Sequence, residues 1–285
     1  MSWYTEFKSS LKSYDVEEIF DIYFYRPLSF LFVKLIYSTN ITPNQISAFS
    51  MLFGILTGVF FAFGTPQSFV LAGICLLVSN ILDCADGQLA RLKKNGTGIG
   101  RIIDGFIDYV TGFSMFLGIG IGLSVATGDY FYVWLITLAG AASRTFQNMF
   151  FDNYRNVYML NVYNKGNNLD DEFDEFSRLK KVLERTKGRI VEKFLVSIYL
   201  KYISVQSGAS KDERLDVAPE LYKNKNMMLL RAWSWIGSTT HLTAAILAAF
   251  LNRIDIYLWI TFTLGNLMLL ILYIIQKKTL NGLSK

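Results

Sequence analysis

Residues 83–91 read Asp83-Cys84-Ala85-Asp86-Gly87-Gln88-Leu89-Ala90-Arg91, and Gly100, Asp104 and Asp108 follow at the start of the next apolar stretch. Asp83 and Asp86 are three residues apart, and Asp104 and Asp108 are four apart. Residues at these spacings lie on one side of a helix, so each pair faces one way. A short connection joins the two helices, which we therefore expect to be antiparallel neighbours. The sequence predicts that four carboxylates meet at a similar depth.

Such a cluster needs a partner of opposite charge. A carboxylate costs at least ~2.5 kcal/mol near the middle of a membrane span, less near its end, and neighbouring carboxylates also repel one another. A divalent cation would remove both problems. Carboxylate oxygens suit Mg²⁺ or Mn²⁺, whereas zinc prefers histidine or cysteine, and His241 is the only histidine in the chain. Four carboxylates can hold two ions, which clamp the attacking and leaving oxygens of a phosphoryl displacement.

The distribution of apolar residues predicts an all-α membrane protein. Hydrophobic residues make up 52% of the 285 residues and charged residues 18%, against about 25% charged residues in a typical soluble domain. The apolar residues fall in runs of about 20, long enough to cross a bilayer. We predict six transmembrane helices, at about Pro43–Gly64, Ser68–Arg91, Gly100–Ala126, Tyr130–Phe151, Met227–Leu251 and Ile254–Gln276.

The charged connections predict how these spans are oriented. The net charge is +5, but the basic residues lie between the spans, where they set orientation and contact anionic lipid. We therefore expect no nucleic-acid partner. The second and fourth connections are basic, and the first and third carry no basic residue. This alternation predicts that both termini and the carboxylates face the cytosol in a multi-pass integral membrane protein.

Two parts of the chain lie outside the predicted spans. Residues 1–42 are expected to be a cytosolic segment in which Val16–Ser38 forms an amphipathic helix at the membrane interface. Residues 43–285 are expected to form the six-helix domain, with a long cytosolic connection at about 153–226. An apolar piece of that connection, Ile190–Ile203, contains Lys193 and Lys201. We expect it to be interfacial or packed on the bundle.

The carboxylates allow other interpretations on chemistry alone. Aspartates inside a membrane also mark proton or sodium pathways in transporters. Transporters often contain broken helices or related halves, and the sequence shows no related halves. A purely structural salt-bridge network is a third possibility, although Arg91 is the one obvious counter-charge within the stretch. Gly87 and Ala90 leave room for a ligand or for close helix contact.

The spacing D-x2-D-G-x2-A-R-x8-G-x3-D-x3-D resembles the signature of the CDP-alcohol phosphotransferases. Every fixed position of that signature is matched here by Asp83, Asp86, Gly87, Ala90, Arg91, Gly100, Asp104 and Asp108. The resemblance also covers the order of a surface helix and six spans, but not the long fourth connection. It implies an enzyme that transfers a substituted phosphate group from a CDP-linked alcohol to a hydroxyl and releases CMP.

The resemblance also implies roles for the motif residues. Asp83, Asp86 and Asp104 would bind two Mg²⁺ or Mn²⁺ ions, and Asp108 would touch one of them. Asp108 would also be the general base that takes the proton of the acceptor hydroxyl. The implied nucleotide and donor contacts are Pro43, Asn44, Gly87, Ala90, Arg91, Thr97 and Gly100.

The acceptor side is predicted from two arginines at about the depth of the aspartates. Arginines there usually face the bundle interior, so Arg144 and Arg231 are hypothesised to bind a phosphate on the acceptor. Snorkelling of these side chains to lipid headgroups is the alternative. Arg155 and Lys201 are weaker candidates. His241 is interpreted as a helix–helix contact within a span.

The favoured function is transfer of a phosphatidyl group from CDP-diacylglycerol to a small polar acceptor, inositol phosphate or glycerol phosphate. The same motif also permits a soluble CDP-alcohol donor with a lipid or inositol-type hydroxyl acceptor. An ion-coupled transporter and a catalytically silent scaffold are the alternatives from other classes. Expected partners are the donor, the acceptor and the bilayer. A homodimer through Gly118, Gly120 and Gly122 is possible, but packing of these glycines inside one bundle is favoured.

Overall fold

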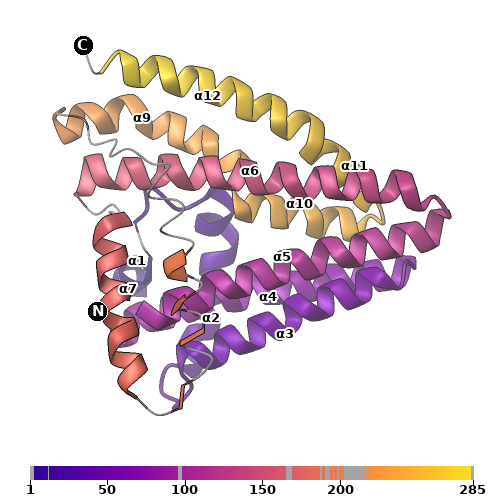
Figure 1. Cartoon of the computed structure of the whole chain (residues 1–285), viewed down its shortest axis with the longest axis horizontal. Helices are drawn as coiled ribbons and strands as arrows, with labels where there is room; N and C mark the ends of the chain where they lie inside the picture. The colour runs from indigo at the N-terminus through magenta and orange to yellow at the C-terminus, as the bar shows by residue number, and fades with distance from the viewer. Residues whose placement is uncertain are drawn as a thin grey trace.

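The computed structural model describes residues 3–11, 13–95, 98–164, 169–186, 188–189, 193–194, 196–197, 199–201, 215 and 217–283. Within these ranges all regular secondary structure is helical (Figure 1). The expected all-α class is therefore confirmed for this part of the chain.

Helices α3 (Pro43–Ala62), α4 (Pro66–Lys93) and α5 (Gly98–Thr127) lie together and carry the carboxylate motif. Local sequence fixes where the first two begin. Thr42 and Thr65 each accept a hydrogen bond from the backbone N–H three residues on, and a proline follows each threonine. This capping box, with proline at the first helical position, is a strong helix-start signal.

Glycines bring α3 and α5 into backbone contact. A side chain on Gly58 would lie 2.2 Å from the Ser114 carbonyl oxygen, and one on Gly118 would lie 2.1 Å from the Gly58 carbonyl oxygen. Gly122 is equally close to the backbone of Phe61. These glycines therefore pack within the chain, as small residues do where membrane helices approach closely.

The second half of the chain covers this group of helices. It consists of α6 (Tyr130–Tyr163), α9 (Pro219–Trp233), a 3₁₀ turn (Ser234–Ile236), α10 (Ser238–Phe250), α11 (Ile254–Ile260), a π-helical turn (Thr261–Gly265) and α12 (Asn266–Asn281). Figure 1 shows α6 running alongside α5, with α9 and α12 on its far side.

Four stretches in the described part of the chain have the length and hydropathy of a membrane span: Pro43–Ala62, Pro66–Lys93, Ile102–Thr127 and Ile254–Asn281. The predicted count of six is therefore not confirmed. The predicted fourth span belongs to α6, which is long enough but carries polar residues such as Arg144 and Gln147. The predicted fifth span is not one helix, because the chain breaks at Gly237 between α9 and α10.

The N-terminal residues form α1 (Trp3–Ser10), a turn, a π-helical turn (Asp21–Tyr25) and α2 (Arg26–Ile36). The helical part of the segment predicted over Val16–Ser38 thus begins a few residues after Val16. Phe30 and Val33 are buried, whereas Tyr23, Leu31 and Leu35 are exposed. An exposed apolar face is compatible with the predicted contact with lipid, but the position of this segment relative to a bilayer stays a prediction.

The long fourth connection contains α7 (Leu169–Arg185), which crosses one end of the bundle (Figure 1). Phe176 and Leu183 of α7 are buried together with Val196, Leu200 and Ile102. The described part of the apolar piece at 190–203 therefore packs on the bundle, beside the first turns of α5.

The two ends of the bundle differ in what they carry. Both termini and α7 lie at one end, and the turns after α3, α5 and α10 lie at the other (Figure 1). The motif connection between α4 and α5 is at the same end as the termini. This arrangement agrees with an even number of crossings, while the side that faces the cytosol stays a prediction.

Candidate metal centre and active site

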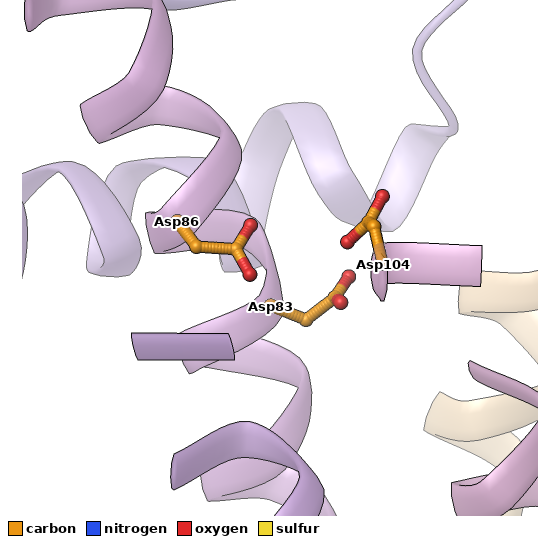
Figure 2. Close-up of side chains that lie close together, drawn as sticks. All are labelled: Asp83, Asp86 and Asp104. Carbon is orange, nitrogen blue, oxygen red and sulfur yellow. The ribbon is translucent and has the colours of Figure 1, made fainter. Parts of the chain in front are cut away.

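Asp83 and Asp86 of α4 and Asp104 of α5 point toward one another (Figure 2). One carboxylate oxygen from each lies within 4.8 Å of the others. Asp86 is the most deeply placed, with 5% of its surface exposed, and the other two are half-buried. Two antiparallel helices thus bring together three of the four predicted carboxylates.

Asp108 lies one turn further along α5 than Asp104, and its side chain is exposed. It does not belong to the group of three, but its charge acts on both Asp83 and Asp86. Asp108 is therefore near the carboxylate group and open to an incoming molecule, as a residue that exchanges a proton with a substrate must be.

The three grouped carboxylates fit a hard divalent cation. All their ligand atoms are oxygens, and within the described residues the group contains neither histidine nor cysteine. This donor set suits Mg²⁺ or Mn²⁺ and not zinc. The separation of up to 4.8 Å also allows one ion to contact oxygens from several of them.

Ser47 of α3 donates a hydrogen bond to the Asp86 carboxylate. Its hydroxyl also lies 3.1 Å from the Pro43 carbonyl oxygen, so the start of α3 is tied to the motif. Pro43 is half-buried and Asn44 exposed at this end of the helix. Sequence reasoning selected Pro43 and Asn44 but missed Ser47, which lies one turn later and could have been found from helix spacing.

Several motif residues contact the N-terminal segment, which is defined here as residues 10–11 and 13–26. Arg91 donates from Nε to the Ser10 carbonyl oxygen, and Gln88 donates to the Ser10 hydroxyl at 3.2 Å. Arg26 donates to the Cys84 carbonyl oxygen at 3.3 Å and forms a buried ion pair with Glu17 at 3.1 Å. The sequence did not predict these contacts, because the partners are far apart along the chain.

The same segment reaches α10. Glu18 is buried and accepts hydrogen bonds from the backbone N–H groups of Thr239 and Thr240, at 3.1–3.2 Å. Asp21 accepts a bond from the Thr239 hydroxyl at 3.1 Å. Burial, followed by the negative charge of Asp21, raises the pKa of Glu18 to about 8. Glu18 thus caps the free N–H groups that every helix start leaves unpaired.

The remaining predicted donor contacts that the structure describes lie on α4 and α5, the helices that carry the three carboxylates. A side chain on Gly87 would be 3.4 Å from the Arg91 guanidinium, an ordinary contact distance, so space for the arginine does not by itself require glycine there. Ala90 and Gly100 are half-buried on α4 and α5. Thr97 lies outside the described residues.

The two predicted acceptor arginines have different surroundings. Arg231 donates to the backbone carbonyl oxygens of Tyr14 and Glu17, at 2.6 and 2.7 Å. Arg144 lies against α5, with its Nη1 atom 3.6 Å from the place of a side chain on Gly112. Of the weaker candidates, Arg155 pairs with Asp152 at 2.8 Å, and Lys201 is exposed.

Four helices in the described part of the chain have the length and hydropathy to cross a membrane, which points to an integral membrane protein. The three carboxylates between α4 and α5 are arranged so that they could hold a metal ion. Residues 40–165 match the family model described as CDP-alcohol phosphatidyltransferase. The resemblance carried by the motif is thereby confirmed for this region, which is less than half of the chain.

Two curated archaeal proteins are similar to the chain. It is 28% identical over 164 residues to a bifunctional IPC transferase and DIPP synthase of Thermococcus kodakarensis, which covers 57% of this chain and 33% of that protein. It is 36% identical over 89 residues to an archaetidylinositol phosphate synthase of Pyrococcus horikoshii, covering 31% of this chain and 46% of that protein. The matched region thus spans less than half the length of either relative.

Proposed function

We propose that the chain is a CDP-alcohol phosphotransferase of phospholipid biosynthesis. It transfers a phosphatidyl group from CDP-diacylglycerol to the hydroxyl of inositol phosphate or glycerol phosphate and releases CMP. The observation that carries this proposal is the convergence of Asp83, Asp86 and Asp104, with Asp108 one turn away, inside the region that matches the family.

The motif residues have two kinds of role, the binding of metal ions and donor and the transfer of a proton. Asp83, Asp86 and Asp104 would hold two divalent ions, and Asp108 would touch one of them. Bound Mg²⁺ or Mn²⁺ would neutralise the diphosphate and stabilise charge that develops on its oxygens. Asp108 takes the proton of the acceptor hydroxyl as its oxygen bonds to phosphorus, and the bond between that phosphorus and the CMP oxygen breaks. The nucleotide end of the donor is surrounded by the residues that the motif implies for this role: Pro43, Asn44, Gly87, Ala90, Arg91, Thr97 and Gly100.

A lipid-linked donor is supported by the surface of α5 beside Asp108. Phe106, Tyr109 and Phe113 are 44%, 67% and 70% exposed. Exposed aromatic side chains on a membrane helix face acyl chains, so a donor with lipid tails could approach along the helix that carries the base. The inositol-type acceptor is supported by the name of the Pyrococcus relative, an archaetidylinositol phosphate synthase.

The test is CMP release by the purified protein with CDP-diacylglycerol, inositol phosphate or glycerol phosphate, and Mg²⁺ or Mn²⁺. We expect release to require the metal and to fall by a factor of about 10² to 10⁴ in Asp108→Asn, since that is the usual contribution of a general base. Asp129→Asn, in the turn at the opposite end of α5, is the matched control and should behave as the unmodified protein.

Three outcomes would contradict the proposal: CMP release without metal, full activity in Asp108→Asn, or acceptor uptake into vesicles without CMP release. The last outcome would favour the transporter. The helix break at Gly237 is the observation that favours a transporter, because transporters use such breaks to bind substrates. In this chain, however, the N–H groups freed by the break bind Glu18.

A further inference from the structure

The N-terminal segment covers the side of α4 next to the carboxylates. Cys84, Gln88 and Arg91 follow one another at spacings of four and three residues, so they share one side of the helix. Asp83 and Asp86 lie on a neighbouring side, which faces the carboxylate of α5. Cys84 is 4% exposed and Gln88 is 0% exposed. The motif helix thus has one side for metal and another that packs against residues outside the region matched by the family model.

Gln88 ties two parts of the N-terminal segment to this side of α4. Its side-chain nitrogen donates to the Ser10 hydroxyl and to the Arg26 carbonyl oxygen, at 3.2 Å in both cases. The Ser10 hydroxyl in turn donates to the Phe7 carbonyl oxygen at 2.6 Å, within the last turn of α1. Ser10, like Gln88, is fully buried. Because water does not reach these groups, loss of the Gln88 amide would free the end of α1 from one of its attachments to α4.

The Arg91 guanidinium is held at one edge and has an unpaired donor at the other. Its Nε atom donates to the Ser10 carbonyl oxygen, while its Nη2 atom is buried without a hydrogen-bond partner. Both terminal nitrogens lie 3.4 Å from the place of a side chain on Gly87, which follows the candidate metal ligand Asp86. A guanidinium is planar, and its N–H groups have fixed directions. Fixing Nε at Ser10 therefore also fixes where the terminal nitrogens point.

The N-terminal segment is itself attached to both halves of the bundle. Arg26 donates to the Cys84 carbonyl oxygen at 3.3 Å and pairs with Glu17 at 3.1 Å. Arg231 of α9 donates to the carbonyl oxygens of Tyr14 and Glu17, at 2.6 and 2.7 Å. These bonds define the path of the chain between α1 and α2. The Ser10 carbonyl oxygen is consequently held in place from several directions and not only by Arg91.

We infer that Gln88 and Ser10 are positioning residues for the Arg91 guanidinium. This inference rests on the proposed function, in which Arg91 contacts the donor. A planar guanidinium binds a diphosphate well only when it approaches in the correct orientation. Gln88 keeps Ser10 against α4, and Ser10 fixes Nε, so the terminal nitrogens meet the donor with less conformational freedom to lose. Gln88 stands at a variable position of the motif, so the signature itself assigns it no role.

The first test separates the donor from the acceptor by kinetics. Gln88→Met keeps the length of the side chain and removes its amide. We expect the KM for CDP-diacylglycerol to rise about tenfold, as for a weakened hydrogen bond to a charged group, while the acceptor KM and the affinity for Mn²⁺ stay unchanged.

Gln276→Met on α12 is the matched control for this variant. Gln276 is 3% exposed and forms hydrogen bonds with Asn226 and Trp233 of α9. The substitution therefore removes a buried amide of the same kind at a place away from the motif. We expect it to leave the donor KM unchanged.

A double-mutant cycle tests whether the effect of Gln88 depends on Arg91. Lysine keeps the positive charge but has no planar fork to orient. In an Arg91→Lys protein, Gln88→Met should therefore change the donor KM by less than about twofold, the usual limit for residues that act independently of one another's geometry. Equal tenfold rises in the two backgrounds would show that Gln88 does not act through Arg91 and would overturn the inference.

A third measurement needs no turnover. Phenylglyoxal modifies arginine side chains, and mass spectrometry reports how fast Arg91 reacts in the full-length protein without substrate. We expect about fivefold faster modification of Arg91 in Gln88→Met, because the net contribution of one hydrogen bond to holding the side chain is lost. In Gln276→Met the rate should equal that of the unmodified protein.

Each result decides a separate point. An unchanged donor KM in Gln88→Met overturns the positioning role, and so does a parallel rise of donor and acceptor KM, which indicates packing alone. If the unmodified protein releases no CMP with any donor, the proposed function fails and the modification rate decides: equal rates overturn the inference, and faster modification supports it. If thermal unfolding in detergent shows that Gln88→Met is not folded, Ser10→Ala replaces it, because it loses only the hydroxyl that accepts from Gln88.

Discussion

Ser47 illustrates how the site depends on a side chain outside the motif. It donates to Asp86 from α3, a helix that contributes no carboxylate to the group of three. A hydrogen bond to one oxygen of a carboxylate fixes the direction of the other, which is how outer neighbours orient metal ligands. Asp86 is also the most buried of the three, so few other groups can replace Ser47.

At this scale we predict that Ser47→Ala lowers the affinity for Mn²⁺ by about 10- to 100-fold, the usual effect of losing an outer neighbour of a metal ligand. Calorimetric titration with Mn²⁺ measures this change. Ser114→Ala is the control, since the Ser114 hydroxyl also bonds between two helices, from α5 to the Ile55 carbonyl oxygen of α3, but not to a carboxylate. Equal Mn²⁺ affinities in the two variants would show that Ser47 does not orient Asp86.

The sequence predicted the local part of the site and missed the distant part. The spacing of three residues correctly placed Asp83 and Asp86 on one side of α4, because helix geometry alone decides this. The structure brings Asp104 of the next helix to them, but Asp108 is not part of this group. The contacts of Arg91 with Ser10 and of Arg26 with Cys84 join residues 81 and 58 positions apart. Such contacts depend on how elements pack, and no spacing rule covers them.

At the scale of elements, the contact between α3 and α5 depends on the absence of side chains. The Gly118 position faces the Gly58 carbonyl oxygen, which cannot move without moving the helix. The two helices must keep this distance because α3 carries Ser47 and α5 carries Asp104. Packing at the glycines therefore sets the geometry of the metal centre several turns away.

We predict that Gly118→Ala destabilises the protein by about 1–3 kcal/mol or more, as overpacking does when neighbouring backbone cannot yield. Thermal unfolding in detergent should show a lower midpoint. Gly105→Ala on the same helix is the control, because a side chain there meets no atom within 4 Å. A midpoint for Gly118→Ala as high as that of the control would contradict the close contact.

The break between α9 and α10 is a second feature of this scale. The sequence predicted one membrane-spanning helix over about Met227–Leu251. Instead, Glu18 provides an acceptor for the N–H groups of Thr239 and Thr240 and thereby stabilises a new helix start after Gly237. The partner is more than two hundred residues away, so local propensity could not indicate the break.

Glu18 should make stability depend on pH. The pKa of Glu18 is raised to about 8 in the folded protein, first by burial and then by the negative charge of Asp21. The positive charge of Arg155 lowers the pKa but does not cancel these effects. In the unfolded chain a glutamate has a pKa of about 4.3. The folded state thus holds the proton more tightly, and the stabilisation is complete below the unfolded pKa and is lost as the pH rises through about 8.

We therefore expect the unfolding midpoint of the unmodified protein to fall, relative to that of Glu18→Gln, as the pH is raised from about 4 to about 8. Thermal unfolding at a series of pH values measures the difference. Glu6→Gln, which removes an acid paired with Lys34 near the surface, is the control and should follow the unmodified protein. Parallel curves for Glu18→Gln and the unmodified protein would show that Glu18 does not titrate in this range.

At the scale of the whole molecule, the charges and the fold divide the bundle in the same way. The end with both termini and the motif connection also has the basic connections, and the other end has the turns after α3, α5 and α10. Positively charged connections stay in the cytosol. The sequence thus predicted the relation between the two ends, although two of its six spans lack the expected length or hydropathy in one helix.

Cysteine labelling in intact cells tests the orientation. Cys75 and Cys84 are both buried free thiols and are first replaced by alanine. We predict that Asp129→Cys, in the turn after α5, reacts with a membrane-impermeant maleimide, while Lys278→Cys at the end of α12 reacts only after the membrane is opened. Labelling of both positions in intact cells, or the reverse pattern, would contradict a cytosolic active site.

The hydrogen bonds of Ser10 with Arg91 and Gln88 matter for the design of a truncated but active form of this protein. Homology alone suggests trimming the chain near residue 40, where the family match begins. Such a fragment would lack Ser10, which accepts hydrogen bonds from Arg91 and Gln88. It would also lack Arg26, which donates a hydrogen bond to the Cys84 carbonyl oxygen. Expression vectors should therefore keep the first forty residues and carry any fused tag at the opposite terminus.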